Sequence, residues 1–590
     1  MRYIKKYIYW LSLSLILITL LLYGVLSTEA TLPEFRLPNG ESLSIFQSED
    51  GVCYVFLPAY AAPEQLTAVC PDAFTLNGIS IENGSLCSDI ALDTAYRLEV
   101  PGFAPTTLRF CRSANVPSLH INTRSGSMTQ IHSDQSHEEE SRMSLYTADG
   151  ILHCTDSLCT LQGRGNSTWL SKKKPYTLTL STASGLLGMS ESTKWTLLAN
   201  SFDQTNLRNK LVLDFAERVG PGWAPSGEFV DVYFNGTYFG LYLLTEGIGT
   251  AADQLELDFT SGEFLCTTSF ETSNTFLSSL NRNIEVCVPK SMSPADLQRI
   301  QALVAEMEQM ITSGADLQKL PTFDLDSWVR RYLIDELFCN IDADRASSYF
   351  YCKDGVFLAG PIWDYDVTMG NNNVNREPTA FYAKTYRKYS GYLSPYYHHL
   401  YQNPSFYQAV CRIYRTEYLP AIEQLLNDHL PALSARIAAA AQMNALRWQT
   451  SIEPAGFLAD YLRKRTDFLT STWVDGTEYC TVQFQVDTFS GYRGYSVPKG
   501  TLLDLTNTDL IDTDWIISST GERFDPALPV TEDLVLTAQA KAVPPPSVPE
   551  SGFIDTQTLL TGASLFLFGL FLAILLRTDH HRRRQEKEVR

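Results

Sequence analysis

The chain has 590 residues, a formal net charge of −20 and an isoelectric point near 4.9. Its length is sufficient for several domains that each bury an ordinary core. The acidic excess argues against nucleic acid as the main partner, because nucleic-acid-binding domains carry basic surfaces.

The twelve cysteines predict an oxidising compartment. They show no pair of C-x-x-C motifs, so a zinc site is not expected. Several stand close together in sequence: 53 and 70, 87 and 111, 154 and 159, 266 and 287, 339 and 352, with Cys411 and Cys480 remaining. We expect disulfides, although sequence does not give connectivity. A bridge between Cys339 and Cys352 would join an acidic turn to the hairpin beside it.

The N-terminal region predicts a membrane-related segment and then a β-rich module. A basic start leads into an apolar run over residues 8–26, so residues 1–30 are predicted to be a signal peptide or an N-terminal membrane anchor. Residues 31–115 contain short alternating runs broken by Pro, Gly and Asn. This pattern is typical of a small β-sandwich.

A glycine-containing turn and a lysine-rich strand follow. Residues 161–169 read Leu-Gln-Gly-Arg-Gly-Asn-Ser-Thr-Trp, a turn that can bring backbone N–H groups to an anion without matching a dinucleotide or Walker A pattern. A strand is predicted over residues 172–180, with Lys174 at its head on the apolar face. A lysine in that position is costly unless it meets an anion. A phosphate contact is one interpretation, and a surface lysine at a strand end is the other.

The next elements are a helix and a hairpin. An amphipathic helix is predicted from Asp203 or Thr205 to Val219, with Arg208 and Asn209 in its first turn, where they can reach a phosphate or a carboxylate.

The hairpin is predicted over residues 230–244, where two β-rich runs flank Asn235-Gly236. This dipeptide suits the type I′ turn of a two-residue loop. The second run ends in a polar break at Glu246.

Two acidic segments follow a predicted helix over residues 323–339. The helix leads into a turn with Asp342 and Asp344, and a short hairpin over residues 348–359 then leads into Trp363-Asp-Tyr-Asp366. The hairpin can bring both carboxylate clusters to one point. Such clusters suit a metal–phosphate site, in which one group orients a hydroxyl and another holds Mg²⁺. Solvated turns or a structural Ca²⁺ site are the alternatives.

The C-terminal region returns to strands and then to the membrane. Residues 478–541 predict a β-grasp-like repeat module, and residues 542–555 a Pro-rich linker. An apolar run followed by basic residues predicts a transmembrane helix over 556–577 and a basic cytoplasmic tail over 578–590. The bulk of the chain is therefore expected outside the cell, anchored to the cell membrane by one or two passes.

Taken in order, the central motifs resemble those of the CotH kinase family, named for a spore-coat protein kinase with an atypical protein-kinase-like fold. The motifs are Gly163-Arg-Gly-Asn-Ser-Thr-Trp169, Lys173-Lys-Pro-Tyr176, Leu187-Gly-Met189, Lys194-Trp-Thr-Leu-Leu-Ala-Asn200, Leu207-Arg-Asn-Lys210, Asn235-Gly, Gly240-Leu-Tyr-Leu-Leu-Thr-Glu246 and Trp363-Asp-Tyr-Asp366. The resemblance covers roughly residues 116–470. It implies an α+β protein with a two-lobed, atypical kinase-like core. The small all-β modules and the C-terminal membrane helix that flank this core are predicted from the sequence pattern, since the resemblance does not cover them.

The resemblance also implies a nucleotide site. Lys174 would hold the phosphates, or Lys173 if the strand register shifts by one. Glu246 would lie at the hinge that receives adenine. Arg208 and Asn209 would lie on the helix packed over the site.

The resemblance gives roles to the acidic segments. Asp342 would orient the acceptor hydroxyl, with Asp344 as its rival, and Asp364 would bind metal with Asp366 in support. No H-R-D precedes Asp342, and Ser347 or Ser348 stands where a second metal ligand is expected.

The expected function is transfer of the γ-phosphoryl group of ATP, with Mg²⁺ or Mn²⁺, to Ser or Thr of an extracytoplasmic or envelope protein. A non-catalytic surface adhesion or assembly protein that keeps the kinase scaffold is one alternative. A metal-dependent phosphate-ester hydrolase or transferase is the other.

Overall fold

The computed structural model describes residues 31–248, 254–269, 273–384, 395–487, 491–506 and 508–539. The predicted N-terminal segment, Pro-rich linker, transmembrane helix and basic tail lie outside these ranges. Within them, the structure contains no helix that is long and apolar enough to span a bilayer.

The N-terminal module consists of two sheets with the strand orders β2-β1-β5 and β3-β4-β9-β8-β6-β7. Its strands are β1 (Glu34–Arg36), β2 (Ser42–Ser44), β3 (Phe46–Gln47), β4 (Cys53–Leu57), β5 (Thr67–Val69), β6 (Phe74–Leu76), β7 (Ile79–Ile81), β8 (Ala95–Glu99) and β9 (Thr106–Arg112). Phe35 of the smaller sheet packs edge-to-face on Phe74 and Phe110 of the larger one. The two sheets therefore share one apolar core.

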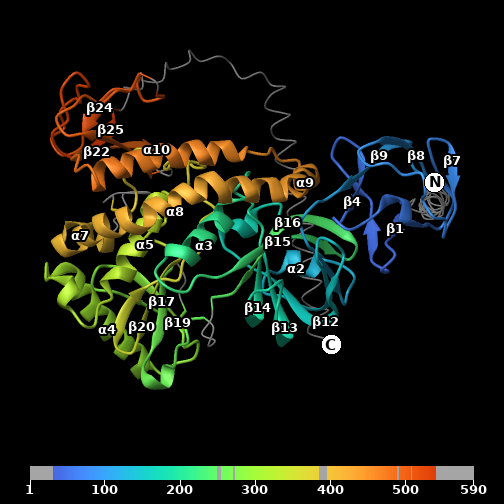
Figure 1. The fold of residues 1–590 in the computed structure, drawn as a ribbon, viewed down its shortest axis with the longest axis horizontal. Helices are drawn as coiled ribbons and strands as arrows, with labels where there is room; N and C mark the ends of the chain where they lie inside the picture. The colour runs from blue at the N-terminus through green and yellow to red at the C-terminus, as the bar shows by residue number, and fades with distance from the viewer. Residues whose placement is uncertain are drawn as a thin grey trace, which may run out of the picture. The chain divides into compact units, whose positions relative to one another are not determined.

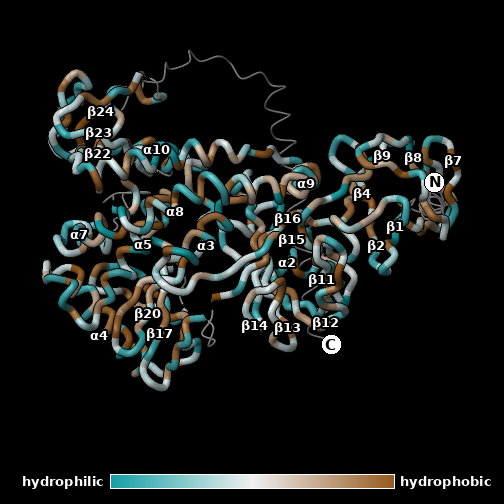
Figure 2. The backbone as a smooth tube through the Cα atoms, in the orientation of Figure 1, coloured by the Kyte–Doolittle hydropathy of each residue, from teal (hydrophilic) through white to brown (hydrophobic). Residues whose placement is uncertain are grey.

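The next lobe is a closed barrel with the strand order β10-β11-β12-β13-β14-β16-β15. Its strands are β10 (Ser118–Thr123), β11 (Glu138–Tyr146), β12 (Leu152–Gly163), β13 (Tyr176–Gly185), β14 (Glu191–Leu198), β15 (Gly227–Phe234) and β16 (Thr237–Glu246), with a short helix α2 (Thr129–Ser133). Asn235 and Gly236 both have positive φ angles, 49° and 78°, so the predicted hairpin is confirmed. Figure 2 shows apolar residues along β15 and β16, which contribute to the core.

The helical lobe is built on a sheet with the order β18-β19-β17-β20-β21. The strands are β17 (Phe264–Thr268), β18 (Thr275–Leu277), β19 (Asn283–Val288), β20 (Ser348–Lys353) and β21 (Val356–Ala359). The helices are α3 (Arg208–Val219), α4 (Pro294–Thr312), α5 (Leu325–Leu337), α6 (Pro395–Gln402), α7 (Pro404–Ile413), α8 (Leu419–Gln424), α9 (Leu430–Trp448) and α10 (Ala455–Trp473). In Figure 1, α3 lies between the barrel strands and α5, and it contacts both. The α+β fold class is confirmed.

Helix α3 begins later than the sequence predicted. The predicted start was Asp203 or Thr205, but the helix starts at Arg208. The Asp203 carboxylate accepts hydrogen bonds from the backbone N–H groups of Thr205 and Arg208, at 2.9 and 2.8 Å. This side chain satisfies free N–H groups in a turn before the helix, so the helical pattern cannot extend back to it.

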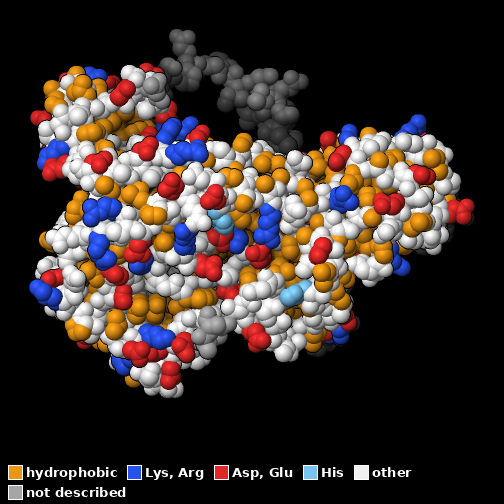
Figure 3. Space-filling view, viewed as in Figure 1, with side chains coloured by type: hydrophobic (Ala, Val, Ile, Leu, Met, Phe, Trp, Pro, Cys, Tyr) orange, Lys and Arg blue, Asp and Glu red, His pale blue; other side chains and the backbone are white. Residues whose placement is uncertain are grey.

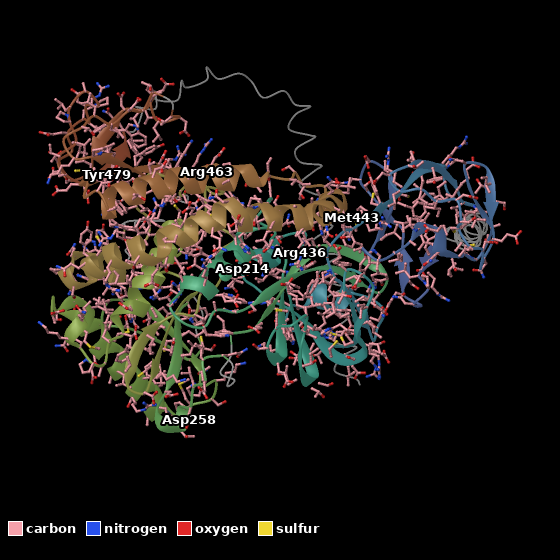
Figure 4. All side chains as sticks on the ribbon, viewed as in Figure 1. Asp214, Asp258, Arg436, Met443, Arg463 and Tyr479 are labelled. Atoms are coloured by element: carbon pink, nitrogen blue, oxygen red, sulfur yellow. The ribbon has the colours of Figure 1, made fainter. Side chains whose placement is uncertain are left out.

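Helix α9 joins the barrel, the helical lobe and the N-terminal module. In Figure 4, Arg436 of α9 lies near Asp214 of α3, within a charged cluster in which Arg436 pairs with Glu228 at 2.6 Å and Asp214 accepts from His429 at 2.7 Å. Further along α9, Met443 packs into the core of the N-terminal module. Figure 3 shows acidic and basic side chains interspersed over this face. The N-terminal module is therefore packed directly against the core.

The C-terminal module contains a sheet with the order β23-β22-β25-β24, whose central pair is parallel. Its strands are β22 (Tyr479–Asp487), β23 (Gly491–Pro498), β24 (Trp515–Ile517) and β25 (Leu534–Ala538). Arg493 Nε donates to the Asn373 carbonyl at 3.2 Å, and Ser496 Oγ accepts from the Phe381 N–H at 3.3 Å. These contacts hold the segment that follows the Trp363-Asp-Tyr-Asp366 motif.

The predicted disulfides are not observed, because all twelve cysteines are free thiols. Cys339 follows α5 and lies beside Tyr461 and Arg465 of α10. Cys352 lies within β20, paired with Phe264 and Phe357 of the neighbouring strands. The two residues therefore belong to different parts of the helical lobe, which nearness in sequence did not reveal.

Candidate active site

A cavity of about 450 Å³ lies between the barrel and the helical lobe. The barrel side contributes the turn after β12 and the end of β14, and the helical side contributes α3 and the two predicted acidic segments. The charged and amide side chains that line it are Arg164, Asn166, Asn200, Asn209, Asn340, Asp342, Arg345, Asp364 and Asp366. Four of the seven predicted site residues therefore meet here: Asn209, Asp342, Asp364 and Asp366.

Asp342 is held in the turn after α5. Its backbone N–H donates to Asn340 Oδ1 at 3.0 Å, and its carboxylate pairs with Arg345 at 2.8 Å. The side chain is half-buried, so it remains accessible from the cavity.

Its rival Asp344 is directed elsewhere. Asp344 is 2% exposed, and its Oδ2 accepts from the backbone N–H of Tyr396 at 3.0 Å, in the first turn of α6. Its other oxygen lies 3.8 Å from Arg282. Asp344 does not line the cavity. Of the two predicted candidates, only Asp342 faces the space where a substrate would bind.

Asp364 has a left-handed backbone conformation, with φ of 69°. This conformation is unfavourable for a residue with a Cβ atom and needs support from its surroundings. The next N–H, that of Tyr365, donates to Asn209 Oδ1 at 2.8 Å, and Asn209 Nδ2 donates to Asn200 Oδ1 at 3.0 Å. Helix α3 thus fixes the loop through Asn209. The Asp364 side chain accepts from Ser347 at 3.1 Å.

The acidic groups repel one another. The Asp364 side chain is exposed within the cavity, yet desolvation by the surrounding protein raises its pKa, and the negative charge of Asp342 raises it further. Burial also raises the pKa of Asp366 well above its usual range, assisted by Asp364, Asp203 and Asp342. Negative charge in this cavity is therefore unfavourable until a cation enters.

The donor set fits a hard divalent cation that retains other ligands. Carboxylate oxygens are the ligands that Mg²⁺ prefers, and Mg²⁺ in phosphoryl-transfer sites takes only one or two from protein, completing its shell with water and phosphate oxygens. Among the described residues, no cluster of three or more His, Cys, Asp or Glu side chains is arranged to hold a metal ion. Asp364 and Asp366 are the residues that fit such a partial site.

The barrel wall carries a basic residue, Arg164, for which the sequence predicted no role of its own. Arg164 lines the cavity, 5.5 Å from the ring centre of Trp363. Burial lowers the pKa of Arg164, and the Asp364 charge opposes that shift. The residue stands in the glycine-containing turn, where Gly165 has φ of 85° and a Cβ atom would lie 2.3 Å from Thr168 Oγ1. A charged residue between two glycines was the available signal.

Lys174 does not line the cavity. It precedes β13, and its ammonium group donates to the carbonyls of Trp169 and Ser171 and lies 4.5 Å from the Trp169 ring centre. The fully enclosed lysine is Lys173, which donates to the Leu241 carbonyl and lines a separate cavity of about 210 Å³. Lys174 therefore supports the rim helix Ser167–Leu170.

Arg208 and Glu246 are also outside the cavity lining. Arg208 is fully buried; it pairs with Asp203 and Glu453 and donates to the carbonyl of Thr368 at 2.9 Å. Glu246, at the end of β16, accepts from the N–H groups of two serines, Ser190 and Ser226, at 2.8 and 3.0 Å. The nucleotide contacts of Arg208 and Glu246 stay predictions. The observed bonds show that both side chains hold neighbouring backbone segments in place.

The structure thus has two lobes with an acidic cavity between them. The family model described as CotH kinase protein matches residues 161–469, just over half of the 590-residue chain. The chain belongs to the CotH kinase family. The match includes the turn with Arg164 and both acidic segments. No curated protein matched the chain.

Proposed function

We propose that this protein is an ATP- and Mg²⁺-dependent protein kinase that phosphorylates Ser or Thr of an extracytoplasmic or cell-envelope protein. The observation that carries the proposal is the meeting of Asp342, Asp364 and Asp366, from two separate loops, in one cavity opposite Arg164. Family membership supports the same reaction class.

Asp364 and Asp366 would hold the divalent cation, Mg²⁺ or Mn²⁺. When bound, the cation supplies positive charge against the phosphate oxygens and offsets the desolvation and the mutual repulsion that raise the pKa of both carboxyl groups. Asn209 holds the loop in place through the Tyr365 N–H.

Asp342 would accept a proton in this reaction. In the proposed step, the acceptor hydroxyl oxygen forms a bond to the γ-phosphorus of ATP, and the bond from that phosphorus to the β,γ-bridging oxygen breaks. The hydroxyl proton passes to the Asp342 carboxylate, and ADP leaves. Asp342 is held for this by Asn340 and Arg345, so its contribution is mainly orientation.

Arg164 and its turn would bind the phosphates. The guanidinium group faces a cavity whose other wall is acidic, and charge-assisted hydrogen bonds to phosphate are its characteristic contacts. The compact turn at Gly165 lets the backbone of residues 163–168 approach the same space.

The site of action is proposed from the sequence. The apolar segments at the two ends predict membrane attachment, with the kinase core outside the cell and an envelope protein as its substrate.

The test is incubation of the purified full-length protein with γ-labelled ATP and either Mg²⁺ or Mn²⁺, followed by detection of label on the protein or on a generic acceptor. Transfer that depends on the metal and on Asp364 supports the proposal. No transfer, together with an Asp364→Ala variant that binds nucleotide as well as the wild type, overturns it in favour of a non-catalytic scaffold. Release of phosphate without transfer overturns it in favour of a hydrolase.

A further inference from the structure

One buried carboxylate stands behind both acidic loops. Asp335 of α5 is fully buried and accepts four hydrogen bonds. The donors are Arg331 Nε at 2.9 Å, Tyr397 Oη at 2.9 Å, Asn340 Nδ2 at 2.8 Å and Tyr365 Oη. Asp335 has no role predicted from the sequence, because it lies on the buried face of a helix.

The first acidic loop is connected to Asp335 through one amide side chain. Asn340 donates to Asp335 with its nitrogen and accepts from the Asp342 N–H with its oxygen. The Asn340 N–H also donates to the Asp335 carbonyl at 2.8 Å. The position of Asp342 is therefore set by Asp335 with a single residue between them.

The second acidic loop is connected through Tyr365, which stands between Asp364 and Asp366. Its hydroxyl group donates to Asp335, and its ring is 1% exposed. Arg331 adds a second connection, because its guanidinium group donates to the Pro361 carbonyl at 3.0 Å, just before the loop. Both loops thus rest on the Arg331–Asp335 pair.

The small net stabilisation expected from a buried ion pair favours a role for Arg331 and Asp335 in positioning the loops. A buried ion pair often stabilises a fold no more than apolar side chains of the same size would, but the loss of one partner is costly. Here two of the four donors to the carboxylate, Asn340 and Tyr365, belong to the two acidic loops, so one buried group contacts both loops. Ligands held by such outer contacts keep the orientation that a metal requires.

We propose that the Arg331–Asp335 pair is the element that fixes the two acidic loops relative to each other, and that Tyr365 is a positioning residue for the metal carboxylates. The inference rests on the proposed kinase function for the identity of the metal. Its structural part, the coupling of both loops to Asp335, stands on the hydrogen bonds alone.

A matched pair of tyrosines provides the test. Tyr365 and Tyr397 are 1% and 4% exposed, and both donate to Asp335, but Tyr397 lies on α6 and not on an acidic loop. Tyr365→Phe and Tyr397→Phe each remove one hydroxyl group without leaving a large cavity. The full-length variants would be compared by thermal unfolding, by Mn²⁺ titration followed by electron paramagnetic resonance, and by hydrogen exchange in the absence of metal and nucleotide.

We expect similar unfolding temperatures for the two variants, since each loses one hydrogen bond to the same group. Tyr365→Phe should weaken Mn²⁺ binding roughly 10-fold or more and speed exchange over residues 361–369. Tyr397→Phe should leave Mn²⁺ binding within about twofold of wild type and speed exchange in α6 instead.

Equal effects of the two variants on Mn²⁺ binding would overturn the role of Tyr365, as would unchanged exchange over residues 361–369 in Tyr365→Phe. A wild-type protein that binds no Mn²⁺ would count against the proposed function. The exchange comparison would then decide whether Asp335 fixes the loops.

Discussion

The two lobes hold their buried charges in different ways. In the helical lobe, two buried arginines each contact a fully buried carboxylate: Arg331 pairs with Asp335 at 2.9 Å and Arg465 with Glu336 at 2.6 Å. In the barrel lobe, Asp231 is fully buried and accepts from the Tyr238 hydroxyl group at 2.8 Å, but no cation lies within ion-pair distance among the residues described.

The difference between the two lobes is visible in the pKa values of their buried groups. Burial acts to lower the pKa of Arg331, but the surrounding Asp335, Tyr365 and Tyr397 outweigh it and raise that pKa. Burial raises the pKa of Asp231 to about 7, against lowering contributions from Ser113, Tyr238 and Lys173. The helical lobe thus offers a fixed support to the acidic loops, whereas a barrel charge titrates near neutral pH.

Within the helical lobe, we expect carboxylates that line the cavity to contribute to phosphoryl transfer and buried carboxylates that point away from it to contribute to stability. Asp364→Asn should lower phosphoryl transfer roughly 10²–10³-fold without lowering the unfolding temperature, since it removes a carboxylate whose pKa is raised by desolvation and by Asp342. Transfer rates with labelled ATP and thermal unfolding measure the two effects.

The control is Asp344→Asn, in the same acidic region but bonded to the Tyr396 N–H. It should keep transfer near the wild-type rate and lose about 1–3 kcal/mol of stability, the cost of a poorly satisfied buried group. If instead Asp344→Asn abolished transfer and Asp364→Asn did not, the assignment of the two carboxylates would be reversed.

On the barrel side of the cavity, we expect a substitution to have a smaller effect on the rate of phosphoryl transfer. Arg164→Gln should reduce kcat/KM for ATP roughly 10–100-fold, because it removes one or two charge-assisted hydrogen bonds to the phosphates in the transition state. Lys174→Gln is the matched variant, because Lys174 is bonded to the rim carbonyls and not to the cavity. It should lose about 1 kcal/mol of stability and stay within about threefold of wild-type activity. A larger kinetic loss for Lys174→Gln than for Arg164→Gln would return the phosphate role to Lys174.

The sequence predicted which segments meet, because those predictions depend on local signals. The Asn235-Gly236 turn, the period of two in the strands and the break after each strand placed the barrel hairpin and the two acidic segments correctly. The hairpin β20–β21 then brings Asp342 and Asp364 to one cavity.

The sequence did not predict which polar side chains face inward, because their partners are remote. Arg208 donates to the carbonyl of Thr368, which is 160 residues away in sequence. Glu246 accepts from the backbone N–H of Ser190, which lies in a different turn. Periodicity assigns a residue to a face and says nothing about such partners. The role of Arg164 was not predicted for a different reason. A turn has no regular periodicity, so the sequence does not indicate which way its side chains point.

The barrel's titrating charge gives the last prediction, which concerns stability alone. The pKa of Asp231 lies at about 7 in the folded protein against an ordinary 3.8, so its contribution to stability is complete below about pH 4 and is lost as the pH rises towards 7. Asp231→Asn should therefore resemble the wild type below about pH 4, begin to exceed it above that pH, and exceed it at pH 8 by up to about 4 kcal/mol. Lys173 has the opposite sign: its pKa is lowered to about 7 by burial, so its contribution grows from pH 7 towards 10.5. Urea unfolding of the wild type, Asp231→Asn and Lys173→Met between about pH 4 and pH 9 separates the stability change due to Asp231 from that due to Lys173. A pH profile of Asp231→Asn identical to that of the wild type would show that the barrel, like the helical lobe, holds its buried charge in a fixed state.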